Sequence, residues 1–170
     1  MQFKNSEIKA KINRPDEIKK ILESLSADYK GCDLQTDTYF NIKNGRLKIR
    51  EGEIENSLIH YDRKNTTDPT LSNISYTKVP KKNDIKDVLR SALGVLVEVK
   101  KARHIYFIDH VKFHIDHIQG LGDFIEIEVI DRENEYSEKM MHKLCKHYML
   151  LLKVEESDLL THSYSDMLAK

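Results

Sequence analysis

The chain has 170 residues, of which 33% are charged and 39% are hydrophobic, a composition typical of one globular domain with a sizeable core. Its 28 Lys and Arg residues balance its 28 Asp and Glu residues, so the formal net charge is zero. This balance argues against a general polyanion binder such as a nucleic-acid coat protein, although it is compatible with a local basic cavity.

The first half of the chain predicts a strand, a helix and a meander of short strands. Residues 2–12 alternate, with Ile8 and Ile12 on one face and charged side chains on the other, which is typical of a strand. Pro15 suits the first turn of a helix that runs to about residue 26. Asn44-Gly45 signals a hairpin, because both residues tolerate a positive φ. The other elements expected here are strands at residues 34–42, 46–53, 57–64 and 73–80 and a loop at 65–72.

The second half predicts three more helices around a set of hairpin-linked strands. The expected helices cover residues 83–94, 135–152 and 157–168, with Gly94 ending the first and Ser157 as N-cap of the last. Strands are expected at residues 95–100, 102–108, 111–119 and 123–131. Hairpin links make the sheet largely antiparallel, with the helices outside it. About eight or nine strands are enough to close a barrel or tunnel, so we expect an α+β fold of this kind.

Charged side chains recur at alternate positions on several of these strands, most clearly within residues 97–131. Alternate side chains of a strand share a face, so Glu126 and Glu128 point one way and Ile127 the other. Such charged faces are either exposed to solvent or, if the sheet curls until they meet, the wall of a polar tunnel. Charges inside a tunnel need partners, and a triphosphate with Mg²⁺ or Mn²⁺ supplies both signs.

As a set, several segments of the chain resemble the CYTH domain of the triphosphate tunnel metalloenzymes, and most of all its class IV adenylyl cyclase branch. The resemblance rests on NSEIKAKI, QTDTYFNIKNGRLKIRE, LIHYDRKN, VEVKKARHIYFI, FHIDHIQGLGDFIEIEV and the terminal SYSDML. It implies one domain over residues 1–170 and an eight-stranded antiparallel tunnel with helices packed outside. It also implies that the tunnel holds a triphosphate and a divalent cation, Mg²⁺ or Mn²⁺.

The resemblance assigns roles to individual residues. It implies a set of metal-binding carboxylates: Glu7, Asp116, Glu126 and Glu128. It implies a set of basic residues that bind phosphates and contribute to catalysis: Lys11, Arg50, Arg63, Lys101 and Arg103, with Lys64 as the alternative to Arg63.

Lys9 departs from the pattern of the family. The family's opening motif is Glu-x-Glu-x-Lys, and residues 7–11 read EIKAK, so that a cation replaces the second Glu. Lys9 would weaken a second metal site or take over part of the phosphate neutralisation, and we therefore include it among the phosphate-binding residues. The alternative is a cation that balances Glu126 or Asp116 in the tunnel wall.

The resemblance implies a metal-dependent enzyme that acts on a small-molecule triphosphate such as ATP. The first candidate is an adenylate cyclase, a phosphorus–oxygen lyase that converts ATP to cyclic AMP and pyrophosphate. The second is a hydrolase of thiamine triphosphate, tripolyphosphate or a nucleotide, and the third is a binding module without catalysis. Lys9, in place of the motif's second Glu, favours the second or the third candidate. Nucleic acid and membrane are not expected as partners, whereas a homodimer is compatible with the sequence but not required by it.

Few features bear on location or on other chemistries. No apolar run approaches the ~20 residues of a membrane span, and MQFKNSEIKA lacks the apolar stretch of a signal peptide. We therefore expect a cytoplasmic protein. Cys32 and Cys145 form no CxxC spacing and the His residues form no tight ligand motif, so a zinc site is not expected.

Overall fold

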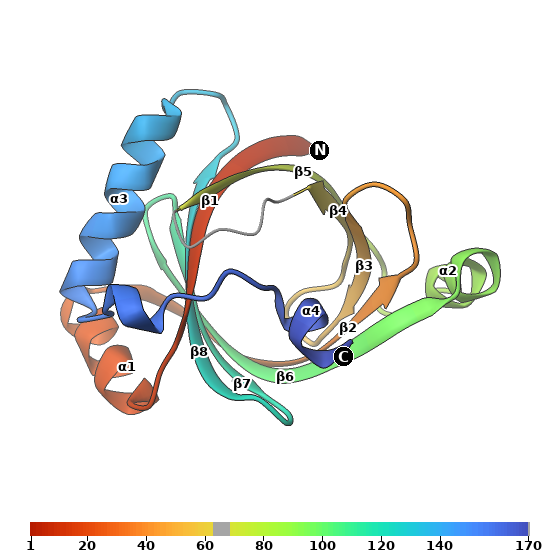
Figure 1. The fold of residues 1–170 in the computed structure, drawn as a ribbon, viewed down its shortest axis with the longest axis horizontal. Coiled ribbons are helices and arrows are strands. Elements are labelled where there is room, and N and C mark those ends of the chain that lie inside the picture. Colours follow the sequence, from red (N-terminus) through yellow and green to blue (C-terminus); the bar gives the residue numbers. More distant parts are fainter. Residues whose placement is uncertain (63–68, 170) are drawn as a thin grey trace.

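The computed structural model describes residues 1–62 and 69–169, apart from the side chain of Thr70, and in this part of the chain eight strands close into an antiparallel barrel (Figure 1). Around the barrel the order is β1-β5-β4-β3-β2-β6-β7-β8, and β8 pairs with β1 to complete the ring. The strands are β1 (Gln2–Lys11), β2 (Asp28–Phe40), β3 (Arg46–Glu51), β4 (Ser57–Asp62), β5 (Thr70–Lys78), β6 (Val95–Ile108), β7 (Val111–Ile118) and β8 (Gly122–Asp131).

This architecture confirms the expected α+β fold, an antiparallel tunnel with helices outside it, and corrects several strand boundaries. Residues 95–100 and 102–108 form the single strand β6, because Lys101 pairs with Gln35 of β2 and with Ile118 of β7 and so continues the ladder. β2 begins at Asp28 rather than at residue 34, since its first part pairs with the end of β6. β5 begins inside the loop expected at residues 65–72, of which residues 65–68 lie outside the described part of the chain.

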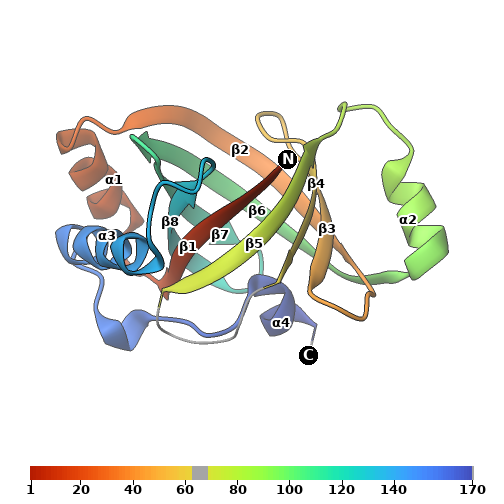
Figure 2. The same ribbon diagram turned by 90° about the horizontal axis from the view of Figure 1, so that it is seen from above.

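The helices surround the barrel or cover one of its ends (Figure 2). They are α1 (Pro15–Ser24), α2 (Ile85–Leu93), α3 (Glu138–Leu151), the 3₁₀-helix η1 (Glu156–Asp158) and α4 (Tyr164–Leu168). α1 and α3 lie together against one side of the barrel, α2 lies at the other side, and α4 lies across an end (Figures 1 and 2). Within the described residues, no helix is both long and apolar enough to cross a membrane.

The C-terminal helix is shorter than the sequence suggests. The region expected as one helix, residues 157–168, is divided into η1 and α4. The N-cap of α4 is Ser163 rather than Ser157, because Ser163 Oγ accepts a hydrogen bond from the Asp166 amide and Asp166 accepts one from the Ser163 amide. Arg46 of β3 holds this helix against the barrel through an ion pair of 2.8 Å with Asp166.

The main hydrophobic core lies between the outer face of the barrel and helices α1 and α3. Ile8, Phe113 and Ile127 of three strands form one buried cluster with Met141 and Cys145 of α3. Because alternate side chains of a strand face opposite sides, this apolar outer face leaves the charged positions inside the barrel. The charged faces of the strands therefore meet around a common interior.

Candidate active site

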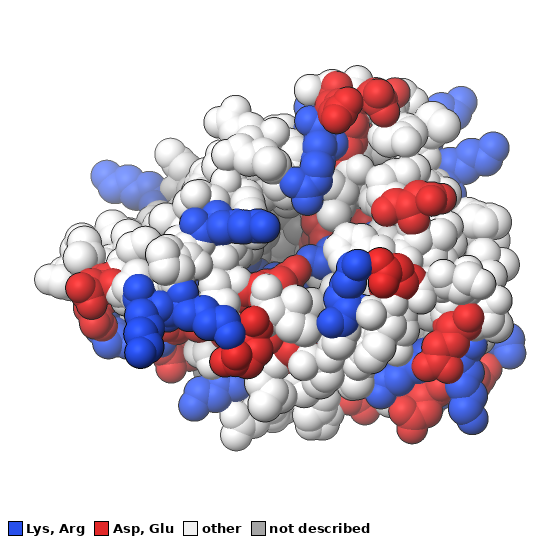
Figure 3. Space-filling model, turned by 180° about the vertical axis from the view of Figure 1, so that it is seen from behind, with Lys and Arg blue, Asp and Glu red and all other residues white. Residues whose placement is uncertain are grey.

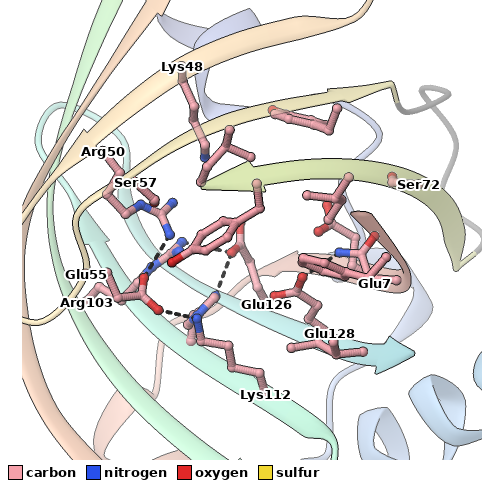
Figure 4. Close-up of a pocket in the computed structure, with 18 of the residues that line it drawn as sticks. Glu7, Lys48, Arg50, Glu55, Ser57, Ser72, Arg103, Lys112, Glu126 and Glu128 are labelled. Carbon is pink, nitrogen blue, oxygen red and sulfur yellow. Dashed lines mark hydrogen bonds and ion pairs between the residues drawn. The ribbon is translucent and has the colours of Figure 1, made fainter. Parts of the chain in front are cut away.

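The barrel encloses a cavity of about 510 Å³ to which all eight strands contribute side chains (Figure 4). The face of the molecule opposite α4 is hollowed at its centre, with basic and acidic side chains around the hollow (Figure 3). Ser163 and Tyr164, at the start of α4, also line the cavity. The C-terminal segment therefore forms part of the cavity wall.

Asp37 of β2 gathers three basic side chains of this wall. Its buried carboxylate accepts from Lys101 Nζ at 2.7 Å, from Arg50 Nε at 2.8 Å and from Lys48 Nζ at 2.9 Å. Burial alone would raise the pKa of Asp37, but these three cations outweigh it and hold the pKa well below its usual range. Asp37 therefore stays ionised and fixes the direction of three cations, of which Arg50 and Lys101 are predicted phosphate ligands.

Arg103 of β6 is held by carboxylates from β7 and β8. Its guanidinium donates to Asp116 Oδ1 at 2.6 Å and to Glu126 Oε2 at 2.8 Å. Tyr164 Oη donates to Asp116 Oδ2 at 3.0 Å. Burial would raise the pKa of Asp116, but the adjacent Arg103 lowers it. Asp116 and Glu126, both predicted metal ligands, are thus engaged by a buried cation in this structure.

Glu126 has two further partners. Lys9 Nζ lies 2.8 Å from its Oε1 atom, and His114 Nδ1 lies 3.0 Å from its Oε2 atom. Lys9 Nζ also lies 3.8 Å from the centroid of the Tyr164 ring. Burial favours the neutral form of Glu126, yet Lys9 and Arg103 hold its pKa well below the usual range. Of the alternatives that the sequence leaves open for Lys9, the structure supports a cation that balances Glu126.

The inward-facing positions of β1 suggest a different alignment of the family motif. Asn5, Glu7 and Lys9 line the cavity, whereas Lys11 is exposed at the end of the strand and is not part of the lining. The Glu-x-Glu-x-Lys spacing therefore fits this wall better when it begins at Asn5. In that alignment Lys9 takes the position of the motif's Lys, and the departure from the pattern moves to Asn5.

Glu7 and Glu128 are the carboxylates best placed to hold a divalent cation. They are direct partners in the β1–β8 ladder, and both line the cavity. Asn5 Nδ2 donates to Glu128 Oε1 at 2.5 Å, while the buried Oδ1 atom of Asn5 has no hydrogen-bond partner among the described residues. Burial raises the pKa of Glu128, and the neighbouring Glu7 adds to this effect against the opposing charge of Lys112. A bound cation would stabilise the ionised form.

This donor set fits Mg²⁺ or Mn²⁺ shared with a substrate. Enzymes commonly hold Mg²⁺ with one or two carboxylates, and phosphates and water complete the coordination. Within residues 1–62 and 69–169, no group of three or more His, Cys, Asp or Glu side chains is arranged to hold a metal ion. A cation at Glu7 and Glu128 would therefore depend on the phosphates for the rest of its ligands.

The structure brings most of the predicted site residues together. Those that line the cavity are Glu7, Lys9, Arg50, Lys101, Arg103, Glu126 and Glu128. Asp116 lies behind Arg103 in the barrel wall. Arg63 and its alternative Lys64 lie outside the described residues.

The site predicted from the sequence gives no role to several charged or titratable residues of the lining, namely Lys48, Glu55, Lys112 and His114, or to Asp37 beside it. Strand alternation does place Lys48 on the face of Arg50, and Lys112 and His114 on the face of Asp116, but the family resemblance assigns them no function. Glu55 lies in the turn between β3 and β4, where no periodicity applies.

Two buried bases of the cavity have lowered pKa values. Burial, with the adjacent Arg103 and Lys112, lowers the pKa of His114 to about 3, so its ring is neutral at neutral pH. Burial and Arg103 also hold the pKa of Lys101 well below its usual range, against the effect of Asp37. Burial disfavours the charged forms of these two side chains. An anion that binds beside them stabilises those charged forms.

Comparison with known proteins gives one family over nearly the whole chain. The model of the CYTH domain matches residues 4–164. A Methanocaldococcus jannaschii protein named "Putative adenylate cyclase" is 24% identical, with 95% of this chain and 96% of its own length covered. A solved Pyrococcus horikoshii structure is 24% identical with a TM-score of 0.79, covering 95% of this chain and 98% of its own. A Hippeastrum structure, described as a "Putative adenylyl cyclase" with a dominant triphosphatase activity, is 14% identical with a TM-score of 0.59. The match covers 96% of this chain and 93% of the Hippeastrum chain.

Proposed function

The chain belongs to the CYTH domain family, and from this premise we propose that it is a divalent-metal-dependent enzyme acting on a triphosphate inside its barrel. The observation that carries the proposal is a group of basic side chains from four strands that face one cavity: Lys9, Lys48, Arg50, Lys101, Arg103 and Lys112. Buried cations require anions beside them, and a linear triphosphate carries enough charge to meet several of them at once.

Carboxylates in the wall prepare these cations for a ligand. Asp37 and Asp116 are buried behind the cations and do not line the cavity, so a bound anion does not need to displace them. They orient Lys101, Arg50 and Arg103 before the substrate arrives. Cations that are already oriented stabilise phosphate charge without having to reorganise during the reaction.

Glu7, Glu128 and the amide oxygen of Asn5 are the residues that we assign to the divalent cation, Mg²⁺ or Mn²⁺. When bound, the cation would neutralise phosphate charge and polarise the phosphoryl group under attack. Since phosphates complete the coordination of the cation, we expect each ligand to raise the affinity of the protein for the other. The cation should bind the protein–triphosphate complex more tightly than the free protein, and the triphosphate should bind the protein–cation complex more tightly than the free protein.

We propose ATP cyclisation as the first reaction, on the basis of the name of the Methanocaldococcus relative. In this reaction the ribose 3′-oxygen forms a bond to the α-phosphorus and loses its proton to a base or to water. The bond between the α-phosphorus and the bridging oxygen breaks, and pyrophosphate leaves. The basic side chains of the wall would hold the β- and γ-phosphates and stabilise the charge that develops on the leaving group.

Triphosphate hydrolysis is the second candidate, and two observations favour it. The Hippeastrum structure is described as having a dominant triphosphatase activity, and Asn5 supplies an amide where the motif, aligned to the cavity, has a carboxylate. In hydrolysis a water oxygen forms a bond to the γ-phosphorus and loses a proton to a base or to water, the bond to the bridging oxygen breaks, and the diphosphate leaves while orthophosphate is formed. The same basic clamp serves both reactions.

One incubation distinguishes these reactions. The protein is mixed with ATP, tripolyphosphate or thiamine triphosphate, each with Mg²⁺ or with Mn²⁺, and the products are separated by chromatography. Cyclic AMP with pyrophosphate supports the cyclase, and orthophosphate supports the hydrolase. Binding without turnover of any of the three would leave a triphosphate-binding module, and absence of binding would refute the proposed function.

A further inference from the structure

Glu55 and Lys112 form an ion pair that crosses the interior of the barrel. Lys112 is on β7, and Glu55 is in the turn that joins β3 to β4. In the barrel order, β6 and β2 separate β7 from β3 on one side, and β8, β1 and β5 separate β7 from β4 on the other. The two side chains therefore come from opposite walls and meet within the cavity that both of them line (Figure 4).

The carboxylate of Glu55 also engages a predicted phosphate ligand. Arg50 Nη1 lies 2.9 Å from Glu55 Oε2, and Gln35 Nε2 donates to the same oxygen at 3.1 Å. Figure 4 shows Glu55 between Arg50 and Lys112, bonded to both. Glu55 thus places an anion where two basic side chains from opposite walls converge, which is the arrangement that a phosphate group would take.

The backbone that carries Glu55 is fixed, so only its side chain can yield. Asp33 accepts hydrogen bonds from the amides of Glu53, Ile54 and Glu55 at 2.7, 3.0 and 2.9 Å. A side chain at Gly52 would place its Cβ 2.6 Å from Asp33 Oδ2, so the turn is closely fitted over this carboxylate. The Glu55 side chain itself is 21% exposed and extends from the turn into the cavity.

Other carboxylates of the wall are less able to give way. Asp37 and Asp116 are at most 1% exposed, belong to strands and do not line the cavity. Glu126 lines the cavity but is held by Lys9, Arg103 and His114. Among the described carboxylates that pair with the basic residues of the cavity, Glu55 alone combines a turn position with a contact across the open space.

We propose that Glu55 is a built-in competitor for the triphosphate: its carboxylate bridges Arg50 and Lys112 across the cavity when no anion is bound, and a phosphate group replaces it there. Lys112 is then an additional phosphate-binding residue. The inference rests on the proposed function, since it takes the ligand to be a triphosphate. The competitor lowers the affinity for every anion that has to displace it, because each such anion bears the cost of moving the carboxylate.

The test measures binding of tripolyphosphate in EDTA, where metal-dependent turnover is absent, by isothermal titration calorimetry. Glu55→Gln keeps the shape of the side chain and removes its charge, and we expect its Kd to be about tenfold lower than that of the wild type. Lys112→Met should raise the Kd about tenfold. Glu53→Gln is the matched control in the same turn: its carboxylate is 81% exposed and pairs with Lys81 outside the cavity, so its Kd should equal that of the wild type.

A second measurement separates competition from a merely structural role. Without anion, Glu55→Gln should melt at a lower temperature than the wild type, because Arg50 and Lys112 lose a charged partner. Saturating tripolyphosphate should raise its melting temperature by more than it raises that of the wild type. If Glu55→Gln does not fold, Glu55→Asp, which keeps the charge on a shorter side chain, should still show a Kd below that of the wild type.

An unchanged or higher Kd in the folded Glu55 variant, or an unchanged Kd in Lys112→Met, overturns this inference while the wild type still binds tripolyphosphate. Failure of the wild type to bind tripolyphosphate overturns the proposed function, and this inference with it.

Discussion

Lys9 and Glu126 face each other as direct partners in the β1–β8 ladder, and their side chains form an ion pair of 2.8 Å inside the barrel. The Lys9 side chain is 5% exposed and that of Glu126 12%, so both charges are largely removed from water. The ion pair with Glu126 explains why a lysine is tolerated at position 9, in a part of the cavity wall that also carries Glu7 and Glu128. Lys9 neutralises the carboxylate that Arg103 and His114 also contact, whereas Glu7 and Glu128 are the carboxylates that we assign to a metal ion.

Breaking this pair should destabilise the protein. We expect Lys9→Met to lower the free energy of unfolding by about 1–3 kcal/mol, because Glu126 keeps Arg103 but loses its second cation. Urea denaturation without ligand measures the change. The double variant Lys9→Met/Glu126→Gln should be less destabilised than the sum of the single variants, and additive losses would show that the two residues are not coupled.

Glu128→Gln should weaken metal binding more than Glu126→Gln does. Glu128 lies beside Glu7 in the ladder, whereas Glu126 is occupied by cations. With tripolyphosphate present, we expect about tenfold weaker Mn²⁺ binding for Glu128→Gln, measured by the electron paramagnetic resonance signal of free Mn²⁺. An equal loss of Mn²⁺ affinity in both variants would show that Glu126 also binds the metal ion, as the family resemblance implies.

Asn5 offers a gain-of-function test of the motif alignment. If the Glu-x-Glu-x-Lys spacing begins at Asn5, then Asn5→Glu restores a carboxylate beside Glu7 and Glu128. We expect Mn²⁺ to bind the tripolyphosphate complex of this variant about tenfold more tightly than that of the wild type. The control is Lys11→Gln, at the exposed end of β1, which should leave both metal and tripolyphosphate affinity unchanged. A loss of tripolyphosphate affinity in Lys11→Gln would instead favour the alignment that starts at Glu7.

His114 makes the stability of the protein depend on pH. Its pKa is lowered from 6.5 to about 3, first by burial and then by Arg103 and Lys112. Below pH 6.5 the unfolded chain binds a proton that the folded chain does not, so stability falls as the pH decreases from about 6.5 toward 3. In EDTA, we expect the wild type to lose about 2 kcal/mol more than His114→Gln between pH 7 and pH 5. Parallel losses in the two proteins would show that His114 does not titrate in this way.

Much of the architecture could be predicted from local patterns. Alternation along residues 123–131 correctly places Ile127 in the core and Glu128 on the opposite face, which lines the cavity, because the side-chain direction of a strand reverses at each residue. The N-cap of α4 is where this reasoning was wrong: Ser157 and Ser163 are both suitable caps, and the anchoring of the segment to the barrel decides between them. Similarly, Lys101 gives no local sign that one strand runs through it, since pairing with β2 and β7 keeps it in the sheet.

The sequence by itself predicted that Glu126, Glu128, Lys101 and Arg103 would face a common interior, because alternation and the family resemblance depend only on residue order. The tertiary structure alone decided which charges meet. Asp37 of β2 pairs with Lys101 of β6, 64 residues away, and Glu55 in the β3–β4 turn reaches Lys112 of β7, 57 residues away. The curled sheet brings these residues together, and between buried side chains about 3 Å apart the Coulomb interaction is strong enough to govern the charge state of each.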